Sequence, residues 1–331
     1  MRKKTISVLL AALLLAGSGC SKAKTDGAVS STQAAEQTPP LATVVTASDF
    51  QNDGTFFTFR ALLDQAAASG VPTPDCAIFG GDYSIKTETD PDDSVRRINE
   101  ELTGAYPAFN PQNAIFVQGN HDNATEVLTP TGAHDMGAFV VYCINEDDFP
   151  SGQMPQQVEP MLNELDAFLS GMVKRKDYRP VIVAGHLPLH DSARADNACG
   201  GSLADLLNRY GHTLDILYLF GHNHSDHYDD SIGGSVNYIA KGESLYVPEP
   251  AQDGTAVIVD PSKITLAFSY LNYGYVGYAN NTENGISTNV LTLGVVQVYP
   301  ETIEITRYTA EGEYCRYSIV LQNTQTAQDA A

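Results

Sequence analysis

The sequence predicts an α/β fold, because short apolar segments alternate with segments whose apolar residues recur at helical spacing. The apolar segments are rich in β-branched residues and bounded by Gly, as is usual for strands buried on both faces. Several of these segments end directly on Asp, Asn or His. In open α/β sheets the loops just past the carboxyl ends of the strands hold ligands, so these endings also indicate a site.

Two pairs of strand and helix open the predicted domain. The segment "LATVVTASDF" ends at Asp49, and "TFFTFRALLDQAAASG" follows with apolar residues at helical spacing until Gly70 stops it. The second strand, "DCAIFGGD", ends at Asp82. A helix is expected after its acidic loop, from about Val95 to Ala105.

The strands that follow end on amide or imidazole side chains. The segment "NAIFVQGNHD" has Asn120 and His121 at its end. After a strand in "GAFVVYCIN" and a helix in "PMLNELDAFLSGMVKRK", the strand "RPVIVAGH" ends at His186. The helix "SLADLLNRYG" then precedes "LDILYLFGHNH", which ends at His222 and His224.

Each of these endings has an ordinary structural explanation when it is taken alone. An Asp can cap the next helix, a His can be a satisfied core imidazole, and "GHNH" can be a polar turn. Helix capping gives no reason, however, for histidines at the other strand ends. Carboxylate, imidazole and amide ligands together suit a hard or borderline divalent cation. The set as a whole therefore predicts a metal site.

Four short motifs lie at these strand ends in a fixed order. They are "GD" at 81–82, "GNHD" at 119–122, "GH" at 185–186 and "GHNH" at 221–224. In order and spacing they resemble the calcineurin-like metallophosphoesterases, over about residues 43–322. The resemblance implies a four-layer α/β/β/α sandwich with two mixed sheets. The strand-rich end of the chain is compatible with the closing strands of such a sandwich.

The resemblance also implies a centre of two divalent metal ions. Its ligands would be Asp82 as the bridge, Asp49 and His224 on the first ion, and Asn120, His186 and His222 on the second. Manganese, zinc, magnesium and iron all stay open, since ligand types narrow the metal without fixing it.

The activity that the resemblance implies is hydrolysis of phosphoester bonds, as a phosphodiesterase or a phosphomonoesterase. Two cations about 3.5 to 4 Å apart share a carboxylate and a bridging hydroxide, which is then the nucleophile. Asp82 would hold this pair of ions together. His121 would stand beside the substrate, where it could donate a proton to the leaving oxygen or stabilise charge on the phosphoryl group.

One position departs from the family pattern. Where the family usually shows Asp, any residue, His, this chain has "DFQ", with Gln51 in place of the His. An amide oxygen suits a hard cation such as Mn or Mg better than a softer metal. Three interpretations stay open: Gln51 ligates weakly, it holds a water on the metal, or the first metal is easily lost. The alternative function is a catalytically weak relative that binds a phosphorylated ligand at the same cleft.

Composition and charge restrict the partners. The 331 residues are 43% hydrophobic and 18% charged, which suits one large domain or two small ones. Acidic side chains outnumber basic ones 40 to 19, and the resulting formal charge of −21 argues against a stable nucleic-acid partner. A small phosphorylated substrate is compatible, because bound cations can outweigh the acidic field locally.

Residues 1–20 have the layout of an export signal, with a basic start, a short apolar core and small residues before Cys20. They resemble a bacterial lipoprotein signal, in which Cys20 would carry lipid and become the mature N-terminus. Gly17 stands where lipoproteins usually have Leu, so simple secretion is the alternative. We expect an exported protein, anchored by lipid to the outer face of the bacterial cell membrane or periplasmic.

Flanking segments and cysteines complete the predicted organisation. Residues 21–42 are polar and lack aromatics, which predicts a flexible tether before the domain at 43–322. Residues 323–331 are a predicted disordered tail. The four cysteines after Cys20 have no CxxC spacing, which argues against a zinc ribbon. Export permits a disulfide or two, and buried free thiols are the equal alternative.

The segment 225–290 and His190 are the remaining candidates for the surroundings of the site. The segment 225–290 is rich in Tyr, Asn and Gly, which fits edge strands as well as an adaptable binding rim. We expect substrate choice to depend on this segment and on the loops after 82 and 122. His190 lies four residues past His186, but Pro188 between them disfavours a helix, so His190 is expected to line the pocket at most.

Overall fold

The computed structural model describes residues 38–51, 55–83, 91–150, 155–190, 199–224, 229–230, 234–235, 238–250, 258–277 and 290–323. The predicted export signal with Cys20, most of the predicted tether, and residues 324–331 of the predicted tail lie outside these residues. The described elements belong to one compact unit, Pro39–Ala331. None of its described helices combines the length and apolar character needed to cross a bilayer.

The predicted helices are present in the described ranges. They are α1 (Thr55–Ala68), α2 (Asp92–Ala105), α3 (Pro155–Arg175) and α4 (Gly200–Gly211), and a short 3₁₀ helix, η1, spans Pro111–Asn113. Helix α3 begins five residues before the predicted segment and contains Pro160 in its second turn. The helix continues through this proline because a stripe of buried residues holds both sides of it against the second sheet, namely Val158, Met161, Leu165, Leu169 and Met172.

The first sheet has the strand order β16-β15-β14-β1-β2-β3. Strands β1, β2 and β3 pair in parallel, whereas β14, β15 and β16 join them in antiparallel pairs. The sheet is therefore mixed. Its strands are β1 (Ala42–Ala47), β2 (Cys76–Phe79), β3 (Ala114–Phe116), β14 (Leu293–Val298), β15 (Thr302–Thr309) and β16 (Gly312–Val320).

The second sheet has the order β10-β13-β7-β6-β5-β4 and is also mixed, with antiparallel strands only at its two edges. Its strands are β4 (Gly132–Asp135), β5 (Val140–Ile144), β6 (Val181–Gly185), β7 (Ile216–Phe220), β10 (Tyr238–Ile239) and β13 (Ser269–Asn272). Two small hairpins are separate from it, β8 (Asp229–Asp230) with β9 (Gly234–Ser235), and β11 (Ser244–Pro250) with β12 (Ile258–Thr265).

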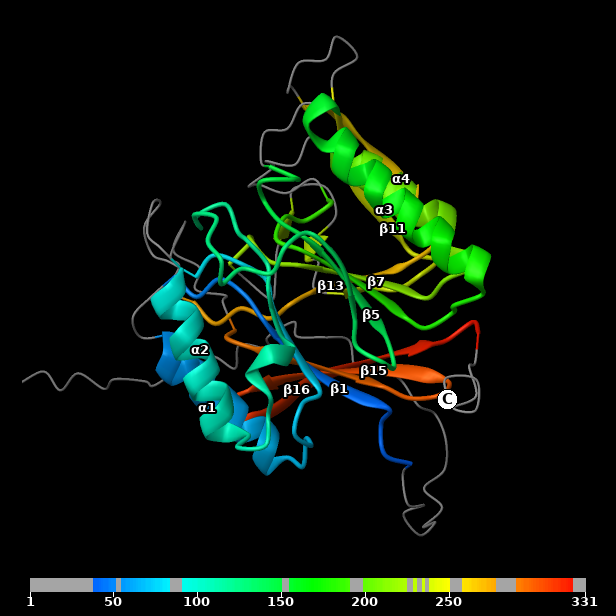
Figure 1. Ribbon diagram of the computed structural model, residues 1–331. Coiled ribbons are helices and arrows are strands. Elements are labelled where there is room, and N and C mark those ends of the chain that lie inside the picture. Colours follow the sequence, from blue (N-terminus) through cyan, green and yellow to red (C-terminus); the bar gives the residue numbers. More distant parts are fainter. Residues whose placement is uncertain are drawn as a thin grey trace, which may run out of the picture. The chain divides into compact units, whose positions relative to one another are not determined.

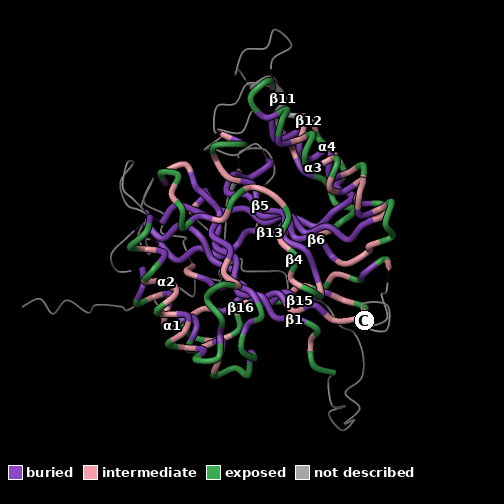
Figure 2. Tube along the Cα trace, in the orientation of Figure 1, coloured by how far each residue is buried: buried purple, intermediate pink, exposed green. Residues whose placement is uncertain are grey.

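The sheets pack face to face, and each carries a pair of helices on its outer face (Figure 1). Neighbouring residues of a strand point to opposite faces, so Val44 and Ile182 lie in the core between the sheets. Val45 packs with α1 and α2, and Val183 packs with α3 and α4. The strands are accordingly buried on both sides in Figure 2. The predicted four-layer α/β/β/α sandwich is confirmed.

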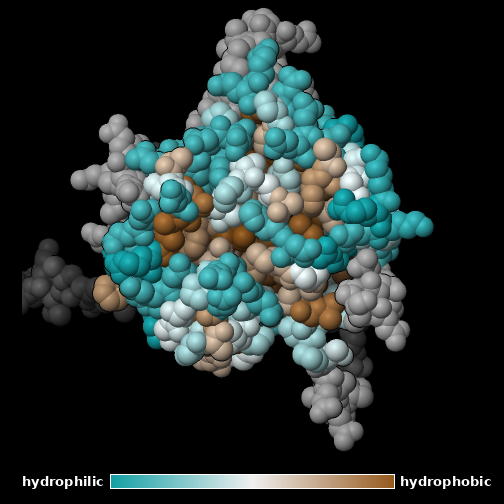
Figure 3. Space-filling view, in the orientation of Figure 1, coloured by the Kyte–Doolittle hydropathy of each residue, from teal (hydrophilic) through white to brown (hydrophobic). Residues whose placement is uncertain are grey.

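The outer helices are amphipathic, and the exposed surface over α3 in Figure 3 is largely hydrophilic. The four cysteines that the structure describes, Cys76, Cys143, Cys199 and Cys315, are buried thiols outside any disulfide, which is the second of the two alternatives that the sequence left open. Burial raises the pKa of Cys199 to about 11, so this thiol is unreactive at neutral pH.

Candidate metal centre

Four of the predicted ligands have a left-handed backbone. The φ angles are 61° at Asp49, 57° at Asp82, 68° at His222 and 53° at His224. Among the residues that the structure describes, Lys176 is the one other non-glycine residue with positive φ. A left-handed L-residue costs roughly 1–2 kcal/mol and persists where the surrounding structure fixes it. Such residues cluster at functional sites, so their coincidence with the predicted ligands supports a site here.

Glycines in the motifs allow these turns to approach one another. A Cβ atom on Gly119 would lie 2.3 Å from both the backbone nitrogen and Oδ1 of Asp82. A Cβ on Gly81 would lie 2.6 Å from the Cα of Gly119, and its own φ is 89°. At the end of β7, a Cβ on Gly221 would lie 2.8 Å from Oγ of Ser48. The "GD" and "GNHD" turns are therefore in backbone contact, and the "GHNH" turn lies against the side chains of Ser48 and Asp49, approaches that only glycine permits.

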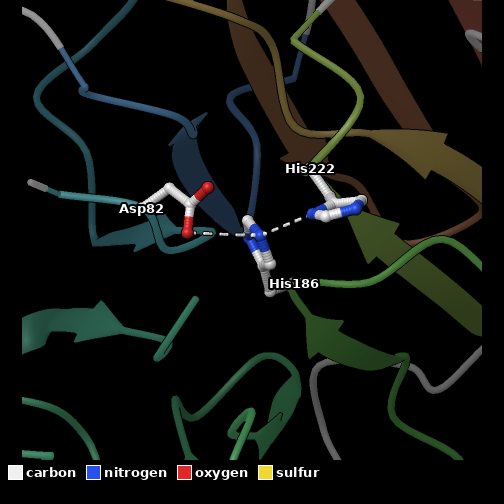
Figure 4. Close-up of side chains that lie close together, drawn as sticks. All are labelled: Asp82, His186 and His222. Atoms are coloured by element: carbon white, nitrogen blue, oxygen red, sulfur yellow. Dashed lines mark hydrogen bonds and ion pairs between the residues drawn. The ribbon is translucent and has the colours of Figure 1, made fainter. Parts of the chain in front are cut away.

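One group of predicted ligands closes around a small volume at the ends of β2, β3, β6 and β7. The side chains of Asp82, His186 and His222 point toward one another in Figure 4. His186 Nε2 lies 3.4 Å from Asp82 Oδ1 and 3.3 Å from His222 Nδ1. Asn120 Oδ1 lies 2.9 Å from His186 Nε2 and 3.0 Å from His222 Nδ1.

These separations fit a divalent cation. Metal–ligand bonds of about 2.0 to 2.2 Å put neighbouring ligand atoms about 2.8 to 3.6 Å apart in octahedral or tetrahedral geometry. The four measured separations in the group fall at or close to this range. The other ring nitrogen of His186 lies 2.6 Å from the carbonyl oxygen of Gly80, which directs Nε2 into the group. The donor set and its geometry therefore suit a metal ion.

The other group shares Asp82 with the first and is wider. It consists of Asp49, Asp82 and His224. His224 Nε2 lies 3.6 Å from Asp49 Oδ1 and 4.0 Å from Asp82 Oδ2. Asp49 is held by its neighbours, since its Oδ2 accepts a hydrogen bond of 2.5 Å from Ser48 Oγ and its Oδ1 accepts one of 3.1 Å from the His222 amide. A cation here would draw His224 inward.

Gln51 lies beside the wider group and contacts the shared aspartate. Its Nε2 donates a hydrogen bond of 2.6 Å to Asp82 Oδ2, and the residue is buried. The amide is thus close enough to the shared carboxylate to serve either as a ligand through its oxygen or as a donor through its nitrogen. The three interpretations of Gln51 stay predictions, and each has to account for its hydrogen bond to Asp82.

Histidines surround the shared carboxylate and control its charge. Burial by itself raises the pKa of Asp82, but the imidazoles of His186, His224 and His121 bring it below its ordinary value. Burial likewise opposes a charge on His186, and the carboxylates of Asp82 and Asp49 outweigh it, so the pKa of His186 is raised. Asp82 is consequently ionised at neutral pH and available as an anionic ligand.

His121, the predicted proton donor, stands beside the groups rather than within them. Its backbone N–H donates a hydrogen bond of 3.1 Å to Asp82 Oδ1. Its Nδ1 is buried and has no hydrogen-bond partner among the described residues. The ring therefore has donor or acceptor capacity left for a ligand.

Asp122 is a site residue that the sequence reasoning did not single out, although it belongs to the quoted "GNHD". Its Oδ2 accepts hydrogen bonds from the amides of Asp82 (2.8 Å) and Gly119 (2.9 Å), and its Oδ1 accepts one from Tyr83 (2.9 Å). One carboxylate thus joins the turns after β2 and β3. Burial, together with the charge of Asp82, raises the pKa of Asp122 to about 7. Its place directly after His121 in the motif is the sequence feature that could have identified Asp122 as a site residue.

His190 is buried and does not join either ligand group. Its Nδ1 lies 2.8 Å from the hydroxyl of Tyr270 and its Nε2 lies 3.4 Å from Nδ2 of Asn223, the residue between His222 and His224. The expectation that it lines the pocket at most is in keeping with this position behind the "GHNH" turn. Of the predicted rim, 225–290, the described part includes Tyr275, which contacts His224.

The chain is similar to one protein family and to several solved structures. The model of the calcineurin-like phosphoesterase family matches residues 42–226. Among solved structures, the chain is similar to GAP50, the anchor in the inner membrane complex of Plasmodium, with 14% identity over 86% of this chain and 89% of that chain and a TM-score of 0.51. A dimetal phosphatase from Danio rerio shows 12% identity over 86% of this chain and 100% of that chain, with a TM-score of 0.48.

A search of curated proteins finds no match. The family match nevertheless covers more than half of the chain, and it includes all four motifs and every predicted ligand. The protein belongs to the calcineurin-like phosphoesterase family.

Proposed function

We propose that the protein hydrolyses phosphoester bonds with two divalent metal ions that share Asp82. The observation that carries the proposal is the pair of ligand groups with this one carboxylate in common. Family membership supports phosphoester hydrolysis in general. The fold alone would not, since one fold supports many functions.

The metal ions would be held by Asp49, Asp82 and His224 on one side, and by Asp82, Asn120, His186 and His222 on the other. When bound, they would supply an activated water and neutralise charge on the phosphoryl group. Gln51 would complete the first set through its amide.

The chain's own residues hold this arrangement and move the proton. The carbonyl of Gly80 orients the imidazole of His186 by accepting a hydrogen bond from its Nδ1–H, which leaves Nε2 for the metal. His121 has a buried ring nitrogen without a protein partner in the described structure, and this supports its role as the group that donates a proton to the leaving oxygen.

Localisation and partners are part of the proposal. Cys20 carries the lipid that anchors the protein outside the cell membrane, and the substrate is a small phosphorylated molecule rather than a nucleic acid. The basis is the signal-like start of the chain and its formal charge of −21. Replacement of Cys20 by Ala is expected to release the protein from the membrane fraction; retention there would refute lipid anchoring.

The test is hydrolysis of bis-aryl and mono-aryl phosphates with Mn²⁺, Zn²⁺, Mg²⁺ or Fe²⁺ added singly to metal-free protein. We expect metal-dependent turnover, and Asp82→Asn should lower it roughly 10³-fold, because several kcal/mol of transition-state stabilisation depend on the shared anion. Asp135→Asn is the matched control, since Asp135 is an exposed carboxylate on edge strand β4. Equal activity of wild type and Asp82→Asn would refute the proposal. The ratio of the two substrates separates diesterase from monoesterase.

A catalytically weak relative that binds a phosphorylated ligand in the same cleft is the second candidate. The hydrogen bond from Gln51 to Asp82 favours it, because this bond occupies the carboxylate oxygen that faces the wider group. If this candidate is correct, Gln51→His should increase turnover at least about tenfold by supplying an imidazole ligand. Fast turnover by the wild-type protein would exclude it.

A further inference from the structure

The imidazoles of the candidate ligands His186 and His224 are held in place by different contacts. His186 is oriented by the hydrogen bond to Gly80, as described above. The imidazole of His224 instead lies flat against the ring of Tyr275, with 5.6 Å between the ring centroids and an angle of 8° between the ring planes. Tyr275 is 1% exposed, so this contact is part of the packed interior. The stack fixes the plane in which His224 Nε2 can face Asp49 and Asp82.

Tyr275 is itself fixed by the backbone that precedes Asp49. Ser48 and Tyr275 form an isolated parallel β-bridge. The amide of Ser48 donates a hydrogen bond of 2.8 Å to the carbonyl of Gly274, and the amide of Thr292 donates one of 2.9 Å to the carbonyl of Tyr275. The segment that presents the ring is therefore tied to the end of β1, which carries the ligand Asp49.

Gly277 provides the space that the tyrosine ring occupies. A Cβ atom at this position would lie 2.6 Å from Cε2 of Tyr275 and 2.7 Å from the carbonyl oxygen of Asp49. The ring and the ligand backbone thus converge on the same glycine. Any side chain at 277 would displace one of them.

We propose that Tyr275 is a positioning residue that selects the metal-binding orientation of His224. This inference rests on the proposed function, because it takes His224 as a ligand of the first ion. The stack restricts rotation of the imidazole before a cation arrives, which lowers the entropy cost of binding. A cation on Nε2 would also withdraw electron density from the imidazole of His224 and make that ring more positive. The electron-rich face of the tyrosine ring stabilises a positive ring beside it.

The experiment is calorimetric titration of the metal-free full chain with Mn²⁺ for wild type, Tyr275→Phe and Tyr275→Leu. The Leu variant removes the aromatic face and should weaken the weaker of the two binding steps about tenfold, the lower end of what residues that orient metal ligands contribute. The Phe variant keeps the ring and should stay within about twofold of wild type. The stronger step, assigned to the His186 group, should not change.

Tyr238→Leu is the matched control. Tyr238 stacks on Tyr317 with 4.4 Å between ring centroids, between the edge strands β10 and β16, and contacts no predicted ligand in the described structure. It should lower the melting temperature and leave both binding steps unchanged. If Tyr275→Leu does not fold, Tyr275→Met replaces it, because methionine also removes the aromatic face and its flexible side chain fills irregular space in a core.

Three results would overturn the proposal. Wild-type affinity in folded Tyr275→Leu would mean that the ring only fills space. An equal loss in Tyr275→Phe would assign the effect to the hydroxyl instead of the stack. Weakening of both steps together would indicate a general structural role. Failure of the wild-type protein to bind Mn²⁺ at all is a different outcome, because it would refute the proposed function itself.

Discussion

The two sheets contribute different chemistry to the candidate centre. The first sheet supplies candidate oxygen ligands from the ends of its three parallel strands, namely Asp49, Asp82 and Asn120. The second sheet supplies candidate nitrogen ligands from the ends of two parallel strands, namely His186, His222 and His224. Neither ligand group is complete within one sheet, so the centre forms only when the sheets are packed together. The core between the sheets is thus a requirement for the site as well as for stability.

The oxygen and nitrogen residues also differ in charge and in how closely they approach one another. The oxygen side provides the negative charge, and the nitrogen side must stay unprotonated to bind a cation. Asp82 meets His186 at 3.4 Å, whereas it meets His224 at 4.0 Å. The group around His186 is therefore already close to coordination geometry, and the group around His224 has to contract. We expect unequal affinities for the two ions.

The largest expected effect comes from the oxygen side. Gly119→Ala would put a Cβ atom 2.3 Å from Asp82 and should lower the free energy of unfolding by about 3 kcal/mol, the upper range for overpacking. Gly171→Ala is the control, because its Cβ would meet only the flexible end of Arg175, at 3.0 Å. Urea unfolding measures both. Equal stabilities would show that the turn after β3 is not packed as described.

A second prediction concerns His190, the buried histidine behind the "GHNH" turn. Burial lowers the pKa of His190 to about 3, whereas an unfolded His has a pKa of about 6.5. Below pH 6.5 the unfolded chain therefore binds a proton that the folded chain does not, and stability falls with pH by about 1.4 kcal/mol per unit. Because the unfolded histidine is already half protonated at pH 6.5, the loss between pH 6.5 and pH 5 amounts to about 1.6 kcal/mol.

His190→Gln removes this titration, so the stability of the variant should fall less steeply than that of wild type over the same range. Urea unfolding of the two metal-free proteins at pH 6.5 and pH 5 gives the difference directly. Parallel curves would mean that His190 is protonated in the folded protein.

The smallest effect sharpens the contrast between oxygen and nitrogen ligands. His186→Asp exchanges an imidazole of the second sheet for a carboxylate, and oxygen ligands favour Mn²⁺ or Mg²⁺ over Zn²⁺. The ratio of Zn²⁺ to Mn²⁺ affinity should fall about tenfold, or about 1.4 kcal/mol. Competition between the two metals measures it. An unchanged ratio of Zn²⁺ to Mn²⁺ affinity would show that His186 is not a metal ligand.

Much of the fold could be predicted because its signals are local. Buried parallel strands such as Val181–Gly185 are continuous apolar runs, and the helix Thr55–Ala68 keeps its buried residues at helical spacing. The start of α3 could not be predicted, since Pro160 is a breaker in isolation. Only its packing against the second sheet keeps the helix intact across the proline.

The site was predictable where the chemistry lies in the ligands themselves. The convergence of Asp82, His186 and His222 follows from strands ending at one edge, and the structure brings them together. The contacts of Asp122 and Tyr275 depend on the packing of segments distant in sequence, for which one sequence offers no spacing rule. The hydrogen bond from Gln51 to Asp82 likewise required coordinates.

The left-handed turns at Asp49, Asp82, His222 and His224 have a consequence for engineering. Glycine would adopt the same backbone at no steric cost, so replacing any of these residues with Gly relieves strain while it deletes a ligand. Selection for thermal stability alone would therefore favour variants that have lost candidate metal ligands. A stabilised form of this protein should be screened for metal uptake at every round.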